Sequence, residues 1–545
     1  MCFRTVTVIR QYSAKTLMTT ASLGLFFVIL AEKLSPDLLG HGMAYVNMFF
    51  FLIYIFLFSF IWKKDYFRTV SLLFAVVMIG EIAINTFLVV GHIAQDEVYT
   101  SRSNFISQFD DMDKLIDLAK DQEQGDFFRM EAIPAKTTND GALFGYPGFP
   151  LFSSTSREDT AQFMRFMAFH GNNINSYKYV ESTPIGDSLF GLKYLVYKEG
   201  QTRDVLLEEV GKSGDMTLYR NPYALEIGAV ADPEFAKWQP QFTNPFKNWN
   251  HMLKKMAGLE NVFVPVDPVV VEGSNFKPSS GDGESGLRFS PEQNDKATLM
   301  RLEVPVDQSQ YVFLAVNVSK DTTVKIKTKK VGQDLEENYE ATNPTGASDT
   351  AKDPSGTVEL TQNRSIHWIE TFNLGYCEAG DIIDVSFEQK QDKASDVTVY
   401  ASTLSLDSYK AAMAELHSRA IDVTEWHESS LKGQYEAKKD GMLYLSVPYD
   451  SSWQVKIDGE KVETASVGKG ALLAVPTTAG SHTLEMHFIP KGFWPGLGLS
   501  LLGILLWIIL IPREKALVMA YRKKAAEKRY QKRLAKALAK QKKGA

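Results

Sequence analysis

The chain has 545 residues, of which 45% are hydrophobic and 23% charged, and its 59 Lys and Arg against 65 Asp and Glu give a net charge of -6. This composition is ordinary for a globular chain and excludes a pure transporter. Without its basic C-terminal tail the chain is clearly acidic, so nucleic acid is not expected as a partner. The two cysteines, Cys2 and Cys377, exclude a fold that relies on several disulfides.

Three apolar stretches near the N-terminus, at about residues 16–31, 42–62 and 69–90, predict membrane-spanning helices. The first has a basic flank and a short apolar core, as a signal peptide does. No small-x-small cleavage site follows it, however, and two further spans do. We therefore expect residues 1–91 to hold three retained transmembrane helices.

The long segment after these helices divides by pattern into an α+β module at 92–258 and a β-sandwich-like module at 259–405. In the α+β module, apolar residues recur at helical spacing over 105–118, and a helix is expected at 157–169. Strand-like pieces lie at 127–131, 192–197 and 216–220. In the next module, short alternating strands are separated by clusters of Gly, Pro, Ser and Asp, which is typical of a sandwich.

Residues 406–427 predict a connecting helix, and residues 428–490 predict a small antiparallel β module. Within that module, Asp458 and Gly459 form a two-residue hairpin turn between two alternating segments. Trp453 could be a platform for a sugar ring, but its alternating position favours a place in the core.

An uncharged apolar run at 493–512 predicts a fourth membrane helix within 491–512, and the tail at 513–545 carries thirteen Lys or Arg against two Glu. Short segments rich in Lys and Arg beside a membrane span stay in the cytoplasm. The basic turn at 62–68 is therefore also expected to be cytoplasmic. The fold class is therefore a multi-pass cell-membrane protein with four transmembrane helices plus a large extracytoplasmic α+β and β-sandwich-like region. Both termini are expected to be cytoplasmic. The tail predicts a helix on anionic lipid headgroups rather than an RNA-binding arm.

Polar residues among aromatic ones give four candidate sugar-binding side chains, Ser153, Ser154, His170 and Asn172. Helix capping and turn formation explain these residue types as well, and we favour that explanation. The sequence has no HExxH or HxxxH spacing, no Cys pair near a His and no Walker-type glycine loop. We therefore expect no metal and no cofactor.

Glu81 and Asn85 lie four residues apart in the third apolar stretch, so their side chains share one helix face at bilayer depth. A carboxyl there costs about 3 kcal/mol on insertion scales and usually faces a bundle interior or a polar cavity. Two roles stay open: a polar clamp to a neighbouring helix, or contact with a lipid phosphate or an acceptor. No residue is assigned a catalytic role.

Spaced sequence blocks in a fixed order carry a family resemblance, among them FFRMEAIP, GFPLFSSTS, DSLFGLKYLVYKEG and SVPYDSSWQVKIDGEKV. From the third apolar stretch to the last, the chain resembles the bacterial YfhO membrane proteins. That family is similar to the GT-C class of glycosyltransferases. The resemblance implies that a sugar passes from a polyprenyl-phosphate carrier to an extracellular cell-wall polymer, such as lipoteichoic or wall teichoic acid.

The chain also departs from the family. Family members look like longer proteins with many more membrane helices, and the acidic residues of GT-C enzymes lie on their first outward loop. Residues 32–41 align instead with a late loop of the family, so we expect the catalytic loop to be missing. The chain would then be part of a split or truncated protein, or would work beside a companion multi-helix polypeptide.

Three functions follow from these patterns. The favoured one is the acceptor-binding outer part of a membrane glycosyltransferase, with membrane lipid, a polyprenyl-phosphate-linked sugar and a cell-wall polymer as partners. The second is a non-enzymatic, membrane-anchored protein that binds glycan or protein. The third, a permease subunit, is the weakest, because four helices with one intramembrane acid offer little substrate path.

Overall fold

The computed structural model describes residues 14–34, 41–60, 67–96, 100–123, 127–198, 204–279, 286–329, 361–391 and 393–541. The chain forms two compact units, Met1–Gln108 and Phe109–Ala545. The first unit is helical, and the second consists mostly of β-sheets followed by one long helix. Most of the loop at 32–41 and of the basic turn at 62–68 lies outside the described residues.

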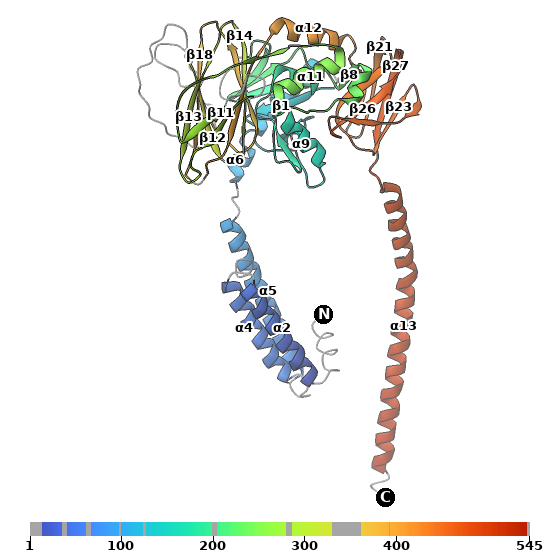
Figure 1. Cartoon of the computed structure of the whole chain (residues 1–545). Coiled ribbons are helices and arrows are strands. Elements are labelled where there is room, and N and C mark those ends of the chain that lie inside the picture. Colours follow the sequence, from blue (N-terminus) through green and yellow to red (C-terminus); the bar gives the residue numbers. More distant parts are fainter. Residues whose placement is uncertain are drawn as a thin grey trace. The chain divides into compact units, whose positions relative to one another are not determined.

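Three long helices make up most of the first unit. They are α2 (Ala14–Leu34), α4 (His41–Phe60) and α5 (Phe67–Asp96), and the short α6 (Arg102–Ile106) follows them. Helix α4 packs against both α2 and α5 (Figure 1). Large apolar side chains point away from the bundle, such as those of Phe49 and Phe87, which are 60% and 79% exposed. A helix surrounded by lipid needs such an apolar outer surface, because the bilayer core offers polar groups no partners.

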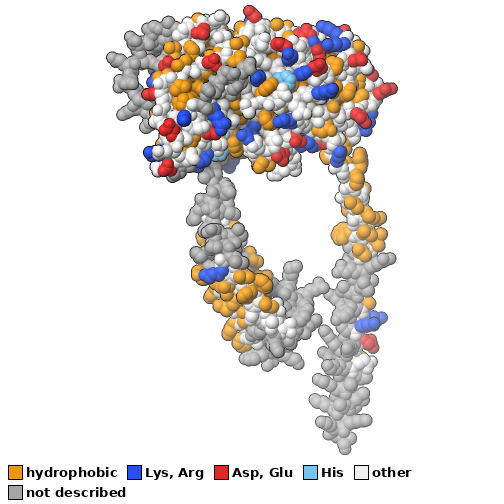
Figure 2. Space-filling model, in the orientation of Figure 1, with side chains coloured by type: hydrophobic (Ala, Val, Ile, Leu, Met, Phe, Trp, Pro, Cys, Tyr) orange, Lys and Arg blue, Asp and Glu red, His pale blue; other side chains and the backbone are white. Residues whose placement is uncertain are grey.

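Two helical stretches among the described residues are long and apolar enough to cross a membrane, Arg68–Gly91 in α5 and Phe493–Leu510 in α13 (Phe493–Gln541). Figure 2 shows hydrophobic side chains along the first part of α13. A shorter apolar stretch, Tyr45–Leu57, lies in α4. Helices therefore occupy all four predicted positions, and two of them have the length and hydropathy of a span. The spans predicted at α2 and α4 stay predictions.

A four-stranded sheet in the order β1-β5-β7-β6 begins the second unit. Strands β1 and β5 run parallel, and the other neighbours run antiparallel. Helix α7 (Phe109–Glu123) packs on this sheet through Met112, Leu115 and Ile116, which recur at helical spacing and are buried. The strands are β1 (Arg129–Ile133), β5 (Leu192–Lys198), β6 (Glu208–Ser213) and β7 (Met216–Arg220).

A small three-stranded sheet in the order β2-β4-β3 and several short helices complete this α+β part. Helix α11 (Pro245–Ala257) is capped by Asn244, whose side chain accepts hydrogen bonds from the amides of residues 246 and 247. The face of α11 that carries Trp249 and Met252 is buried in the main core. The other elements are α8 (Asp140–Phe144), β2 (Leu151–Phe152), α9 (Glu158–Phe166), β3 (His170–Gly171), β4 (Ser176–Lys178), α10 (Pro184–Leu189), β8 (Gly228–Ala231) and η2 (Pro233–Lys237).

Two further sheets form a sandwich, with strand orders β10-β13-β18-β15-β16 and β11-β12-β19-β14-β17, and β9 pairs with β19. The strands of the first sheet are β10 (Val269–Ser274), β13 (Thr298–Pro305), β15 (Thr322–Lys329), β16 (Thr361–Ile366) and β18 (Ile382–Gln389). Those of the second are β9 (Phe263–Val266), β11 (Phe276–Ser279), β12 (Leu287–Pro291), β14 (Gln310–Val318), β17 (Glu370–Cys377) and β19 (Val397–Leu404). Helix α12 (Leu406–His417) follows β19.

Strand β14 shows that the second of these sheets is a middle layer. Its Val312 and Leu314 belong to the sandwich core, whereas Tyr311 and Phe313 belong to the core shared with the α+β part. Both faces of the strand are therefore buried, which explains why its sequence is apolar without alternation.

Two antiparallel sheets form the C-terminal part before α13, in the orders β20-β21-β27-β23-β24 and β25-β26-β22-β8. Their strands are β20 (Asp422–His427), β21 (Ser430–Ala437), β22 (Gly441–Pro448), β23 (Trp453–Ile457), β24 (Glu460–Val462), β25 (Ala465–Val467), β26 (Leu472–Thr477) and β27 (Gly480–Phe488). Asp458 and Gly459 both have positive φ, 52° and 80°, as a type I′ hairpin turn requires.

Strand β8 comes from the α+β segment and pairs with β22, and β20 begins at Asp422, so the C-terminal sheets include residues before the predicted bound of 428. The connecting helix predicted at 406–427 ends at His417, because β20 takes up residues 422–427.

The pairing of β8 with β22 places Gly228 directly against the backbone of Tyr444, and a Cβ at Gly228 would overlap the carbonyl oxygen of that residue. Sequence patterns do not show such a pairing, because its partners lie more than two hundred residues apart.

Gly228→Ala should destabilise the chain by about 2 kcal/mol or more, because the new methyl group must push β8 away from β22. The thermal unfolding midpoint of the purified full chain in detergent measures this. Gly80→Ala is the matched control, since no atom lies within 4 Å of the added carbon at that helical position. Equal midpoints for the two variants would contradict the β8–β22 pairing.

Candidate functional site

The predicted residues Ser153, Ser154 and Asn172 lie at the small three-stranded sheet. The Asn172 side-chain oxygen accepts hydrogen bonds from the backbone amides of residues 174, 175 and 176, at 3.0, 2.9 and 2.9 Å. The Ser153 hydroxyl lies 2.9 Å from that of Thr155 and accepts from the amide of the same residue at 3.2 Å. Ser154 is exposed. This geometry favours turn formation over sugar binding for these side chains.

His170 lies in β3 but is engaged by the sandwich. Its Nδ1 is 2.6 Å from the carboxylate of Glu370, which is only 5% exposed, and its ring lies 5.5 Å from that of Trp368. Nearby, Arg364 forms an ion pair of 2.5 Å with Glu181. These contacts join the α+β part to β16 and β17, so His170 has a structural task.

The intramembrane pair contacts the neighbouring helix. Glu81 of α5 accepts a hydrogen bond from the Tyr54 hydroxyl of α4, and Asn85 donates to the side-chain oxygen of Asn47 at 3.1 Å. The two side chains share one face of α5, as their spacing predicts. The contacts favour the polar clamp between helices over a role at a lipid phosphate.

Sequence patterns did not reveal two buried carboxyl groups in the main core. The Tyr179 hydroxyl donates to Asp187 at 2.8 Å, and the Tyr311 hydroxyl donates to Asp204 at 2.7 Å. Burial raises the pKa of Asp187 to about 8, with a further contribution from the neighbouring charge of Asp204. Burial also raises the pKa of Asp204. Because Asp187 is 6% exposed, it is out of reach of a polymeric substrate.

Asp187→Asn should flatten the pH dependence of stability. Since the pKa of Asp187 is about 8 in the folded chain against an ordinary 3.8, folding takes up a proton between these values. The proton bound by Asp187 in the folded chain adds to the free energy of unfolding, and this stabilisation is fully present below about pH 4. It is lost as the pH rises to 8, so that the free energy of unfolding falls by at most about 1.4 kcal/mol per pH unit. Unfolding midpoints of the full chain between pH 5 and 8 measure the slope. The exposed control Asp121→Asn should keep the wild-type slope, and an unchanged slope in Asp187→Asn would contradict the assignment.

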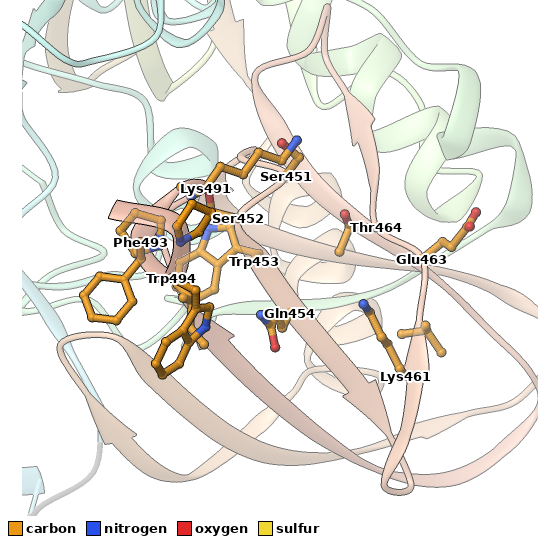
Figure 3. A pocket seen from close by; sticks show the side chains of 15 residues that line it. Ser451, Ser452, Trp453, Gln454, Lys461, Glu463, Thr464, Lys491, Phe493 and Trp494 are labelled. Carbon is orange, nitrogen blue, oxygen red and sulfur yellow. The ribbon is translucent and has the colours of Figure 1, made fainter. Parts of the chain in front are cut away.

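A groove of about 690 Å³ lies where the C-terminal sheets meet the start of α13 (Figure 3). The turn before β23, the segment from β24 to β25 and the β27–α13 junction line it. The lining residues are Ser451, Ser452, Trp453, Gln454, Lys461, Val462, Glu463, Thr464, Ile489, Pro490, Lys491, Gly492, Phe493, Trp494 and Pro495.

Two backbone amides of the junction donate hydrogen bonds to Ser452, in the turn before β23. The amide of Ile489 donates to the carbonyl of Ser452 at 3.2 Å, and the amide of Lys491 donates to the hydroxyl of the same serine at 3.2 Å. Pro495 stands in the first turn of α13, where its missing N–H costs no helical hydrogen bond. The groove therefore lies at the end of a candidate membrane span.

Aromatic side chains form one wall of the groove. Trp453 is half-buried and its ring lies 5.1 Å from that of Phe488, while Phe493 and Trp494 are 50% and 64% exposed. Trp453 thus contributes to the core and also presents a ring face to the groove. Exposed Trp and Phe at the start of a span are typical of the membrane–water interface. The same rings provide flat surfaces for sugars.

The polar side chains of the groove favour an anionic or hydroxyl-rich ligand. Lys461 and Lys491 are exposed and carry the positive charge. The one carboxylate, Glu463, points away from the aromatic wall in Figure 3. No group of three or more metal-ligating side chains occurs among the described residues. Such a groove can bind a phosphate-bearing or sugar-bearing group through ammonium, hydroxyl and ring contacts.

Sequence reasoning missed the groove because its walls are distant in the chain. The exposed Trp494 at the start of a span was the available signal. The proximity of Lys461 to the junction depends on the pairing of β23 with both β24 and β27. The Asp458-Gly459 turn predicts the first pairing, but no local pattern shows the second.

The fold and the groove define a class of protein with a large sheet-rich region, candidate membrane spans, and a groove beside one of them. The family described as Bacterial membrane protein YfhO matches residues 2–500, and the chain belongs to this family. The resemblance found in the sequence is thereby confirmed. A protein of Bacillus subtilis (strain 168) described as "Uncharacterized protein YfhO" is 20% identical over 424 residues, which are 74% of this chain. The chain spans 45% of the length of that relative.

Two solved structures overlap this chain weakly. Arabinofuranosyltransferase AftD from Mycobacteria is 9% identical, with 78% of this chain and 66% of that chain covered and a TM-score of 0.27. PNGF-II is 9% identical, with 42% and 63% covered and a TM-score of 0.15. Superpositions this weak carry no argument about the fold or function of this chain.

Proposed function

We propose that this chain is the acceptor-binding part of a membrane glycosyltransferase that works at the outer face of the bacterial cell membrane. The donor is a sugar on polyprenyl phosphate, and the acceptor is a cell-wall polymer, lipoteichoic or wall teichoic acid. Membership of the YfhO family supports the membrane setting. The observation that carries the proposal is the groove of Lys461, Lys491 and aromatic rings at the end of a span.

The ligand chemistry of the groove fits such an acceptor. Teichoic acids are chains of phosphodiesters with hydroxyl and sugar groups, and lysines attract their negative charge. Trp453 and Trp494 offer ring faces for the sugars. A lipid-linked donor carries its phosphate at headgroup level, which is where a groove beside a span would meet it.

A binding role without catalysis is the second candidate, and one observation favours it. General-base catalysis needs a carboxylate or imidazole within hydrogen-bond reach of the acceptor hydroxyl. Among the described groove residues the carboxylate is that of Glu463, which points away, and Glu81 is engaged by Tyr54. Sugar transfer would then need a companion multi-helix polypeptide. Without such a companion, the chain is a membrane-anchored glycan- or protein-binding protein.

The proposal requires that the sheets lie outside the cell and both termini inside. An impermeant thiol reagent should label Glu460→Cys, at the exposed hairpin turn, in intact cells. It should label Lys523→Cys only after lysis. Native Cys377 is 1% exposed and gives little background. Protection of the hairpin cysteine until lysis would refute this topology.

Replacing Lys461 or Lys491 by Glu should weaken binding of teichoic acid to the purified full chain by about fivefold each, because each change turns attraction into repulsion. Lys410→Glu is the matched control, since this exposed lysine of α12 makes the same charge change away from the groove. Binding is measured by titration in detergent. Equal weakening by the control would show that net charge, and not the groove, governs binding.

The same preparation tests catalysis when it is mixed with donor lipid and acceptor. We expect no sugar transfer by the chain alone. Transfer that Glu81→Gln abolishes would show that Glu81 is the base, and the binding-only account would be wrong.

A further inference from the structure

A small basic pocket lies at the end of strand β8. Its volume is about 220 Å³, and no described residue lines both this pocket and the groove at the start of α13. Three of its lining residues are cations and one is a carboxylate, so the lining carries an excess of positive charge. The lining residues are Val230, Ala231, Asp232, Arg419, Lys438 and Lys439.

The pairing of β22 with β8 brings two lysines to the pocket. Lys438 and Lys439 stand in the turn that leads into β22. Gly441, the first residue of β22, lies directly against β8, because a Cβ at this position would be 2.4 Å from the carbonyl oxygen of Ala231. Glycine permits this close approach. The turn is therefore held at the end of β8 together with its two lysines.

Arg419 reaches the pocket from the segment after α12. Its backbone carbonyl accepts a hydrogen bond from the amide of Val230 at 2.9 Å. Its guanidinium donates to Asp232 at 3.0 Å and also to Glu415, and its side chain is only 15% exposed. A guanidinium has five N–H groups, so these two bonds leave others for a ligand.

The carboxylates at the pocket do not neutralise all of its cations. Oδ1 of Asp232 lies 3.0 Å from Arg419 and 3.2 Å from Lys439, so two cations share one oxygen. Lys438 contacts the Ser418 hydroxyl at 3.5 Å, and no carboxylate in the described part of the chain forms an ion pair with it. Three cations thus face two carboxylates, that of Asp232 and the second one bound by Arg419, and one positive charge remains.

A structural clamp is the alternative explanation, and Arg419 alone would supply it. Its bonds to Val230 and Asp232 already join the end of α12 to β8. The exposed Lys438 and Lys439 are not needed for this, because ion pairs at the surface contribute only about 0 to 1 kcal/mol. A ligand explains why all three cations meet at one pocket, since Arg and Lys are the side chains that bind phosphate.

We propose that this pocket binds one phosphate group of a soluble molecule, either inorganic phosphate or a phosphate monoester. Arg419, Lys438 and Lys439 hold the phosphate oxygens. The volume is below the range of about 300 to 1,000 Å³ that is usual for drug-sized ligands, which fits a small anion. The site is separate from the groove and does not depend on glycosyl transfer.

Isothermal titration calorimetry with inorganic phosphate tests the proposal on the full chain in detergent. The starting protein carries Lys461→Gln and Lys491→Gln, which weaken any phosphate binding in the groove, so that the heat reports the pocket. The pocket variant adds Lys438→Gln and Lys439→Gln, at exposed positions that leave the core intact.

The matched control adds Lys410→Gln and Lys432→Gln to the starting protein instead, at two exposed lysines that do not line the pocket. We expect the starting protein to bind phosphate and the pocket variant to bind it about tenfold more weakly or worse. The control should change the affinity by less than about twofold. Absence of binding by the starting protein, or equal weakening by the control, would overturn the proposal.

The same titration in nanodiscs asks whether a lipid headgroup occupies the pocket. The discs contain phosphatidylcholine alone or an equal mixture with phosphatidylglycerol, at about 0.15 M salt to screen the surface charge of the lipid. We expect the same phosphate affinity in both kinds of disc. Binding that is lost only in the anionic discs would show that a lipid is the ligand, and the proposal of a soluble phosphate would be wrong.

Discussion

The junction between β27 and α13 fixes the C-terminal sheets to a candidate membrane span. Only residues 489–492 separate the last strand from the helix, and even fully extended they reach about 14 Å. The amides of Ile489 and Lys491 donate hydrogen bonds to Ser452, in the turn before β23. The C-terminal sheets are therefore held beside the end of a candidate span. The groove lies beside the end of the candidate span because the junction at residues 489–492 is short.

The junction also affects the rest of the sheet-rich region, because residues of all three predicted modules belong to one hydrophobic core cluster. Trp249 of the α+β part, Phe313 of the sandwich and Tyr444 of the C-terminal sheets belong to the same buried cluster. Strand β8 crosses from one part to another by pairing with β22. A core of this kind resists independent motion of its parts. The groove therefore belongs to a part of the chain whose modules pack against one another.

The sequence predicted the features that depend on nearby residues. The spacing of Met112 and Ile116 predicted helix α7, and the Asp458-Gly459 pair predicted the hairpin. The apolar run after Phe493 predicted a helix that is long and apolar enough to cross a membrane. It could not predict that β8 pairs with β22, because strand pairing at long range leaves no local period.

The candidate site residues also divide into those that local sequence patterns could suggest and those that only the fold brings together. Ser153 and Asn172 were chosen for their residue types, and their hydrogen bonds form turns. Lys461 and Trp494 face one groove only because the sheet brings distant segments together. Asp187 carries a raised pKa because the fold buries it, and burial of a single polar residue cannot be read from its neighbours in the chain.

The central claim is that a sugar-bearing, negatively charged ligand occupies the groove at the membrane surface. Photo-crosslinking in living cells tests it most directly, with a photoreactive amino acid in place of Gln454 inside the groove and, as control, in place of Lys410 on α12. The account predicts an adduct at position 454 that contains both phosphate and sugar, and none at position 410. Equal adducts at the two positions, or an adduct at 454 that contains neither phosphate nor sugar, would contradict it.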